Sequence, residues 1–147
     1  RVITSAKNEK FVSMFIGKLN TKSQQFTYIN AGHNAPILFY ENKFSELNKG
    51  CTLLGINDNL SQVEVAIFDY TSEFSLVCYT DGLTDTSNIT DDNVTIDALQ
   101  EIILKNIKSG PEFLNKALLF YAEEFKGDND FPDDIALMTI KVSDLNF

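Results

Sequence analysis

The spacing of apolar residues changes once along this chain, and that change constrains the fold more than any other feature. Up to Asp81, short runs of β-branched and aromatic residues alternate with turn-forming clusters, a pattern typical of β-strands. From Ile96 onward, apolar residues recur at helical spacing, and a final apolar run covers Ile135–Val142. Strands, then helices, then a strand predict an α+β fold whose helices pack on one face of a sheet.

Closely spaced apolar runs define the predicted strands. They are Phe11–Asn20, Gln25–Asn30, Ile37–Glu41, Phe44–Leu47, Gln62–Tyr70, Phe74–Tyr79 and Ile135–Val142. Short links between them predict an antiparallel meander, with an irregular loop over Gly50–Asn59. Phe74–Tyr79 is nearly all apolar, which predicts a central strand buried on both faces. In the run before it, Val63, Val65 and Ile67 share one face of an alternating pattern.

Two amphipathic helices are predicted in the second half of the chain. The first begins at Ile96, with Thr95 as its N-cap. The second follows the sequence SGPE at 109–112, whose serine and glutamate have the spacing of a capping box and whose proline suits a first helical turn. Gly127 predicts the end of this second helix.

Composition narrows the classes of partner and compartment. The 147 residues suffice for one domain with a sizeable core, and the net charge of −9 argues against binding nucleic acid. No apolar run is long enough to span a membrane, and the opening sequence RVITSAKNEK lacks the core of a signal peptide. Cys51 and Cys78 are too few for a disulfide framework and lack zinc-ligand spacing. We therefore expect a cytoplasmic segment without membrane contact, whose parent protein can still be anchored through an upstream domain.

Carboxylates gather at the ends of two predicted strands. Asp81 ends the most apolar run and is followed by Gly82 and Asp85, while Asp133 and Asp134 precede the final strand. If those strands are antiparallel neighbours, Asp81 and Asp133 converge at one rim of the sheet. Carboxylate oxygens suit Mg²⁺ or Mn²⁺, two such ions can bind a phosphate and activate water, and Gly82 would let the backbone pass close to them. The alternative is that these aspartates only stabilise turns through their own backbone.

The single histidine, His33, lies in a glycine-containing turn with the sequence NAGHN at 30–34. No serine or cysteine partner for it is evident in the sequence, and no serine occurs in the nucleophile-elbow pattern of covalent hydrolases. We therefore expect His33 and the neighbouring Asn34 to support a loop rather than to perform chemistry.

The order of these motifs resembles that of the SpoIIE/RsbU-type serine phosphatases, bacterial members of the metal-dependent phosphatase 2C superfamily. The matching stretches are FVSMFIGKLN, FTYINAGHNAPILF, LLG, LVCYTDGLTD and DDIALMTIKV, which follow the family's order and span nearly the whole chain. TDGLTD and NAGHNAP are specific in combination, whereas DDIAL alone is a weak signal. The resemblance implies a phosphatase 2C-like fold with antiparallel sheet layers and packed helices.

The resemblance also implies roles for individual residues. Asp81 and Asp133 would be ligands of a two-ion Mg²⁺ or Mn²⁺ site, Asp134 a weaker ligand candidate, and Asp85 a ligand of a further, looser ion. A metal-activated water would attack phosphoserine or phosphothreonine directly, with no phosphoenzyme. The implied substrates are phosphorylated regulatory proteins, such as anti-sigma-factor antagonists, in signal transduction by partner switching.

One part of the family's pattern has no counterpart in this sequence. The first metal motif, an aspartate followed by glycine-rich residues, is missing, so residues 1–147 are expected to form the C-terminal portion of a phosphatase domain and to be inactive alone. We expect an upstream sensor or regulatory domain in the parent chain, and an exposed sheet edge would favour a homodimer. The competing hypothesis is a non-catalytic, phosphatase-like module that binds a regulatory partner. A third is an acidic α+β domain whose aspartates have no chemical role.

Overall fold

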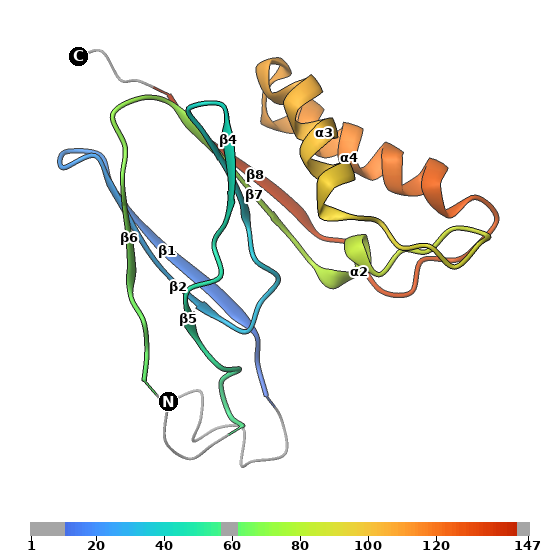
Figure 1. Ribbon diagram of the computed structural model, residues 1–147, viewed down its shortest axis with the longest axis horizontal. Helices are drawn as coiled ribbons and strands as arrows, with labels where there is room; N and C mark the ends of the chain where they lie inside the picture. Colours follow the sequence, from blue (N-terminus) through green and yellow to red (C-terminus); the bar gives the residue numbers. More distant parts are fainter. Residues whose placement is uncertain (1–10, 57–61, 144–147) are drawn as a thin grey trace. The chain divides into compact units, whose positions relative to one another are not determined.

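The computed structural model describes residues 11–56 and 62–143, which form two compact units (Figure 1). The first unit comprises residues 11–35, 46–56 and 62–72, and the second comprises residues 36–45 and 73–143. The opening sequence RVITSAKNEK and the end of the predicted irregular loop, at 57–59, lie outside the described residues. Strands in both units, together with helices in the second, confirm the predicted α+β class.

The first unit is built around a single central strand. Its strands are β1 (Met14–Asn20), β2 (Gln25–Ala31), β5 (Gly50–Cys51) and β6 (Ala66–Asp69). β2 pairs with β1 and with β6 in the antiparallel sense and with β5 in the parallel sense. β2 is the strand that pairs with all the others, so Phe26 and Tyr28 lie in the middle of the sheet. Both side chains are buried, and both stack with Phe15.

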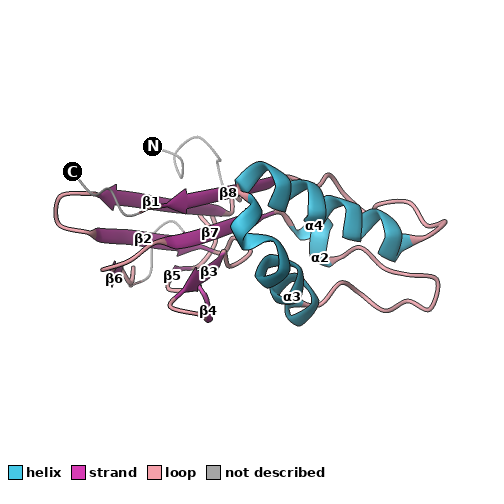
Figure 2. Ribbon diagram, turned by 90° about the horizontal axis from the view of Figure 1, so that it is seen from above, coloured by secondary structure: helices cyan, strands magenta, loops and turns pink. Residues whose placement is uncertain are grey.

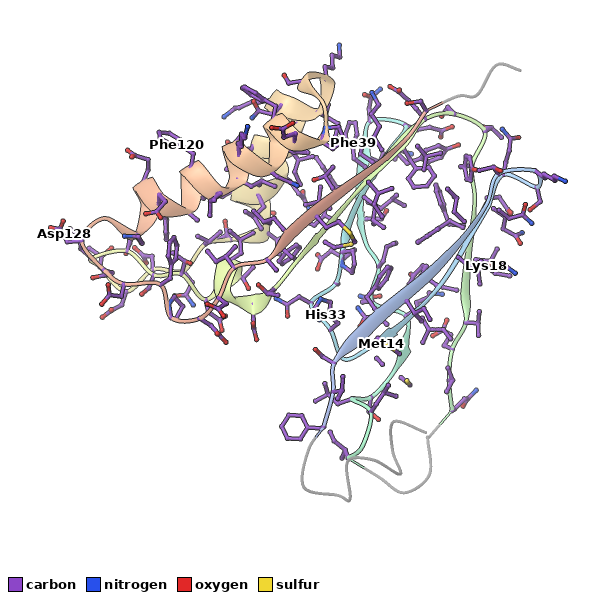
Figure 3. All side chains as sticks on the ribbon, turned by 180° about the vertical axis from the view of Figure 1, so that it is seen from behind. Met14, Lys18, His33, Phe39, Phe120 and Asp128 are labelled. Carbon is purple, nitrogen blue, oxygen red and sulfur yellow. The ribbon has the colours of Figure 1, made fainter. Side chains whose placement is uncertain are left out.

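The other face of this sheet is apolar and open to solvent. Register pairs Ile16 with Ile29 and Thr27 with Ile67, so these side chains share one face. Ile16 is 53% exposed and Ile67 is 60% exposed. The predicted alternation of side chains in the run before β7 is therefore confirmed. The side with Val63, Val65 and Ile67 faces solvent, however, and Ala66 on the opposite side is buried. Figure 3 shows Met14 and Lys18 along β1, at two further positions of the same face.

The second unit contains a four-stranded sheet in the order β4-β3-β7-β8. Its strands are β3 (Ile37–Tyr40), β4 (Lys43–Glu46), β7 (Phe74–Tyr79) and β8 (Leu137–Val142). β7 lies between β3 and β8 and is antiparallel to both. Nearly every side chain of β7 is buried, which confirms the predicted central strand. β3 and β4 form the expected hairpin, whose turn has positive φ at Glu41 and Asn42.

The predicted meander is wrong. Consecutive strands do not continue one sheet: β1 and β2 belong to one sheet, β3 and β4 to the other, β5 and β6 to the first again, and β7 and β8 to the second. The pair β2–β5 is also parallel. Short links show where strands begin and end, but the partner of each strand depends on contacts between residues far apart in the sequence.

A short helix follows β7, and after it the chain forms three further helical segments. They are α3 (Ile96–Asn106), the 3₁₀-helix η1 (Ile107–Ser109) and α4 (Pro111–Lys126). α3 and α4 lie side by side and α4 packs along β8 (Figure 2). The Ala98 N–H donates to the Thr95 hydroxyl at 3.2 Å, which confirms the predicted N-cap. No helix within the described parts of the chain has the length and apolarity needed to cross a membrane.

The predicted capping box at the start of α4 is wrong. Ser109 belongs to η1, and the residue at the N-cap is Gly110, which makes no side-chain cap hydrogen bond. Gly110 has φ 91°, a conformation that suits glycine and that turns the chain between the two helices. Pro111 takes the first helical position, as predicted, and α4 ends at Gly127 with φ 57°.

One hydrophobic core holds the second unit together. It is formed by residues of β3, β7, the short helix after β7, the segment before α3, and α3 and α4 themselves: Ile37, Val77, Tyr79, Leu83, Val94, Leu99, Ile103, Leu114, Leu118 and Ala122. Both helices bury one stripe of this set, since their apolar residues recur every three to four positions. The core therefore fixes the end of β7 and the start of β8, next to which the aspartates lie.

Candidate active site

The pairing of β7 with β8 brings the two groups of aspartates to one rim of the sheet. The strands are antiparallel with Tyr79 opposite Leu137, so the end of β7 meets the start of β8. The Thr80 N–H continues the ladder by donating to the Ala136 carbonyl at 3.1 Å. The predicted convergence of Asp81 and Asp133 required β7 and β8 to be antiparallel neighbours, and the structure confirms that they are.

Thr80 joins the two chain segments at this rim through its side chain. Its hydroxyl donates to the Asp134 carbonyl at 2.9 Å and accepts from the Ala136 N–H at 2.9 Å. The residue before Asp81 is therefore tied to the residue after Asp133. Sequence analysis missed Thr80; the available signal was a hydroxyl residue directly before the aspartate at the end of a buried strand.

Gly82 is needed because the second segment passes directly over it. A Cβ at this position would lie 2.6 Å from the Asp134 carbonyl oxygen and 2.8 Å from the Asp133 carbonyl oxygen. Both distances are far shorter than a van der Waals contact, and both partners are backbone atoms that cannot rotate away. Glycine at 82 thus allows the backbone of Asp133 and Asp134 to pass close to the residue that follows Asp81.

The TDGLTD stretch forms one turn of helix rather than an open loop. Asp81 begins the short helix α2 (Asp81–Thr84), and the Asp85 N–H donates to the Asp81 carbonyl at 2.7 Å. Residues four apart in a helix lie on the same side, so Asp81 and Asp85 both face solvent there. The buried Thr86 hydroxyl donates to the Gly82 carbonyl at 2.7 Å and holds the turn from beneath.

The carboxylates at this rim are oriented by backbone N–H groups. One oxygen of Asp81 accepts from the Gly82 N–H at 3.1 Å, and one oxygen of Asp133 accepts from the Asp134 N–H at 2.7 Å. Both side chains, and that of Asp134, are exposed. Aspartates in turns commonly accept such hydrogen bonds from nearby backbone N–H groups. Here the same bonds also orient each carboxylate.

The donor chemistry of the rim suits a hard divalent cation. All its side-chain donors are carboxylate oxygens, and Mg²⁺ in proteins is commonly held by one or two carboxylates together with water. Within residues 11–56 and 62–143, no group of three or more His, Cys, Asp or Glu side chains is placed to hold a metal ion. The rim therefore fits part of a cation site and does not by itself supply the ligands of a two-ion centre.

His33 is held in its loop by the buried side chain of Asn30. Asn30 accepts from the His33 N–H at 2.8 Å and donates to the His33 carbonyl at 2.9 Å and to the Leu47 carbonyl at 3.0 Å. The expectation that His33 lacks a serine partner is wrong, because the Ser13 hydroxyl lies 3.2 Å from its Nδ1 atom. The two are 20 residues apart and meet only through strand pairing. Asn34 follows in the same turn and is half-buried.

The Ser13–His33 contact is not a catalytic triad. A triad needs a carboxylate that orients the imidazole, and no hydrogen bond in the described chain joins a carboxylate to this ring. Ser13 is also exposed on the segment leading into β1. The contact adds one more attachment to the loop at 30–34.

A cavity of about 430 Å³ opens next to the aspartates of the second segment. It is lined by Leu119 from α4 and by Phe131, Asp133, Asp134 and Ile135 from the segment that leads into β8. Sequence analysis missed it because its walls come from two elements that only the tertiary fold brings together. The cavity shares Asp133 and Asp134 with the rim.

Comparison with known proteins identifies the fold. The solved SiaA-PP2C domain of Pseudomonas aeruginosa matches with a TM-score of 0.79 at 12% identity, over 91% of this chain and 53% of that one. The phosphatase domain of SpoIIE from Bacillus subtilis matches with a TM-score of 0.66 at 12% identity, over 97% of this chain and 64% of that one.

A third match is the catalytic domain of the serine/threonine protein phosphatase PstP in complex with two manganese ions. Its TM-score is 0.66 at 10% identity, over 97% of this chain and 66% of that one. This chain thus spans about half to two thirds of the domains that it matches. These likenesses show a PP2C-type phosphatase fold.

Sequence comparison identifies the family. A search of curated protein sequences finds no significant match. The profile of the family described as stage II sporulation protein E (SpoIIE) matches residues 1–143, nearly the whole chain. This match and the PP2C-type fold agree with the resemblance carried by TDGLTD, NAGHNAP and DDIAL. The chain therefore belongs to the SpoIIE family of PP2C-type phosphatase domains.

Proposed function

We propose that this chain is the C-terminal portion, residues 1–147, of a metal-dependent protein serine/threonine phosphatase domain. The observation that supports the proposal is the rim where the end of β7 and the start of β8 lie side by side, with Thr80 tying the two segments together and Gly82 letting them pass close to each other. A rigid mount of this kind would be needed for carboxylates that bind a cation, whereas turn-forming aspartates would not require it. Family membership supports the same function.

Asp81 and Asp133 would hold the cation, Mg²⁺ or Mn²⁺, and Asp134 or Asp85 would extend the ligand set. When bound, the cation would supply Lewis acidity toward a phosphoryl oxygen and would acidify a water molecule. The backbone N–H groups of Gly82 and Asp134 each donate to one oxygen of the Asp81 and Asp133 carboxylates, and the other oxygen of each would bind the cation. The remaining ligands of a two-ion centre would come from other residues of the complete domain.

The substrate we propose is a phosphoserine or phosphothreonine in a regulatory protein, such as an anti-sigma-factor antagonist in bacterial signal transduction. SpoIIE family membership supports this class of substrate. An upstream sensor or regulatory domain in the parent chain would control the activity. A homodimer is also proposed, because the sheet of the first unit has an exposed apolar face.

Hydrolysis of a phosphopeptide by the complete parent protein tests the proposed function. We expect activity that depends on Mn²⁺ or Mg²⁺, and we expect Asp81→Asn to lower kcat/KM by about a hundredfold or more, because an amide cannot supply the charge of the ligand. Asp97→Asn is the matched control, since Asp97 is an exposed aspartate on α3 and carries the same charge change. Equal activity of Asp81→Asn and the unaltered protein would exclude the assignment.

The alternative is a non-catalytic module that binds a regulatory partner. It is favoured by one observation, the lack of a three-ligand group among the described residues. The same assay separates the two functions: a complete parent protein that binds its phosphorylated partner but releases no phosphate with either cation would be an interaction module.

A further inference from the structure

The cavity beside the rim is lined by both apolar side chains and carboxylates. Leu119, Phe131 and Ile135 provide the walls, and Leu119 is 43% exposed although it is apolar. Asp133 and Asp134 line the same space. Its volume of about 430 Å³ lies within the usual range of ligand-binding pockets. An occupant matched to both parts would itself be part apolar and part charged.

The charge around the cavity is uniformly negative on the segment that leads into β8. Residues 127–140 contain four aspartates, Asp128, Asp130, Asp133 and Asp134, and no lysine or arginine. All four aspartates are exposed, and Asp128 lies in the turn that follows α4 (Figure 3). Only Asp133 and Asp134 line the cavity, but four carboxylates on one short segment raise the local negative potential, which favours a cation over a neutral or anionic group.

The ring of Phe131 already attracts a cation within the protein. The Lys126 ammonium lies 5.3 Å from the centre of this ring, and it also pairs with Glu123 at 3.4 Å. Lys126 is therefore neutralised by its own partner and does not cancel the charge of the four aspartates. Because Lys126 already lies over this ring, Phe131 offers an occupant apolar surface for its stem, and the carboxylates favour a basic end.

Resting on the proposed phosphatase function, we propose that this pocket binds an arginine or lysine side chain of the phosphoprotein substrate. The stem of the side chain packs against Leu119, Phe131 and Ile135. Its charged end lies at Asp134, which then pairs with the substrate, so that Asp85 rather than Asp134 extends the ligand set of the cation. Arginine fits better than lysine, because its planar guanidinium is more weakly hydrated and pairs with carboxylates through two hydrogen bonds.

The shared residue Asp133 limits the distance between this basic side chain and the phosphorylated residue. Asp133 lines the pocket and is also one of the two carboxylates proposed to hold the cation. An extended peptide advances about 3.3–3.6 Å per residue. The basic residue therefore lies within about three positions of the phosphoserine, and the pocket makes the phosphatase selective for substrates with a basic residue there.

A series of phosphopeptides tests the pocket with the complete parent protein and Mn²⁺. Each peptide has a phosphoserine in an alanine background, with one arginine placed in turn at each of about three positions on either side. We expect arginine at one of these positions to raise kcat/KM about five- to tenfold over the all-alanine peptide. Glutamine at that position, which has a long stem without charge, should give only a small part of this gain.

Two variants on neighbouring positions of α4 assign the preference to the pocket. Leu119→Lys places a positive charge in the wall, and we expect it to remove the preference for arginine. Phe120→Lys adds the same charge at the next residue, which is exposed and does not line the pocket, and should retain the preference. Leu119→Gln serves as a milder variant should the lysine disturb folding.

Binding and hydrolysis are measured separately so that the two proposals can fail independently. Affinity for the arginine and glutamine peptides, measured by fluorescence anisotropy, reports on the pocket, and hydrolysis of the all-alanine peptide reports on the phosphatase. Hydrolysis with equal rates and affinities for arginine and glutamine at every position would overturn the pocket proposal alone. Selective binding of the arginine peptide without hydrolysis would overturn the phosphatase proposal alone.

Discussion

At the scale of single residues, the candidate site depends on two small side chains as much as on its aspartates. Thr80 connects the end of β7 to the start of β8 through a hydroxyl that donates once and accepts once. Gly82 leaves the space that the carbonyls of Asp133 and Asp134 occupy. The aspartates could be recognised in the sequence because strand ends rich in carboxylates are conspicuous. The contacts of Thr80 could not, since its partners are 54 and 56 residues away.

Replacing Thr80 tests this connection. We expect Thr80→Val, which keeps the shape but removes both hydrogen bonds, to lower the free energy of unfolding by about 1–3 kcal/mol. Thr80→Ser keeps the hydroxyl and should stay close to the unaltered chain. Urea unfolding followed by circular dichroism measures both variants. If valine and serine have the same effect, the hydroxyl does not hold the rim together.

Cys78 gives a prediction that depends on pH. Burial raises the pKa of its thiol from 9.0 to about 11. The folded state therefore favours the protonated thiol, and the stability that this contributes is present below pH 9 and is lost as the pH rises toward 11. At pH 8 we expect alkylation of Cys78 to be about a hundredfold slower in the folded chain than in urea, because only the thiolate reacts. Mass spectrometry of the alkylated peptides measures this, and equal rates would contradict the shift.

At the scale of elements, local patterns predicted the helices well and their ends less well. The apolar stripe of α3 and its Thr95 cap were identified from a window of about a dozen residues, because both depend on neighbours one or two turns away. The start of α4 was mispredicted because SGPE also fits a glycine N-cap with a positive φ. The four residues alone do not decide whether Ser109 or Gly110 is the N-cap.

Two leucines on α3 test how the helix is held. Leu99 is 1% exposed and belongs to the core, whereas Leu104 is 55% exposed. We expect Leu99→Ala to lower the free energy of unfolding by about 2–5 kcal/mol, since it leaves a cavity in a closely packed core. Leu104→Ala, the same substitution on the same helix, should cost less than about 1 kcal/mol. Similar losses for both in chemical unfolding would show that α3 does not pack on the face assigned to it.

At the scale of the whole molecule, each unit has its own sheet, and the exposed apolar face of the first is a liability in water. Monomeric proteins rarely expose contiguous apolar patches of this kind. β1 has one hydrogen-bonded neighbour among the described strands, so its free edge adds backbone groups that can pair with another chain. These two features favour association of the isolated chain with itself.

Charges on this face should prevent that association. We expect the isolated chain to sediment as a dimer or larger species at micromolar concentration, and the double variant Ile16→Lys/Ile67→Lys to sediment as a monomer, because two like charges would be brought together on the apolar face. A control with Lys at Leu104 and Ile89, both exposed in the second unit, should associate like the unaltered chain. A monomeric unaltered chain at all concentrations would contradict the prediction.

The sequence by itself determined most of the strands, the two long helices, that β7 is a buried central strand, and that carboxylates follow β7 and precede β8. These properties follow from hydrophobic period and turn chemistry, which act over a few residues. The sequence did not show β5, which lies in the predicted irregular loop, or the helical turn α2. Only the tertiary structure decided that the strands divide between two sheets, that Thr80 and Gly82 hold the end of β7 against the segment before β8, and that Leu119 lines a pocket with Asp133 and Asp134. Such features depend on contacts between distant residues, and local preferences do not specify which distant partner a strand or side chain will meet.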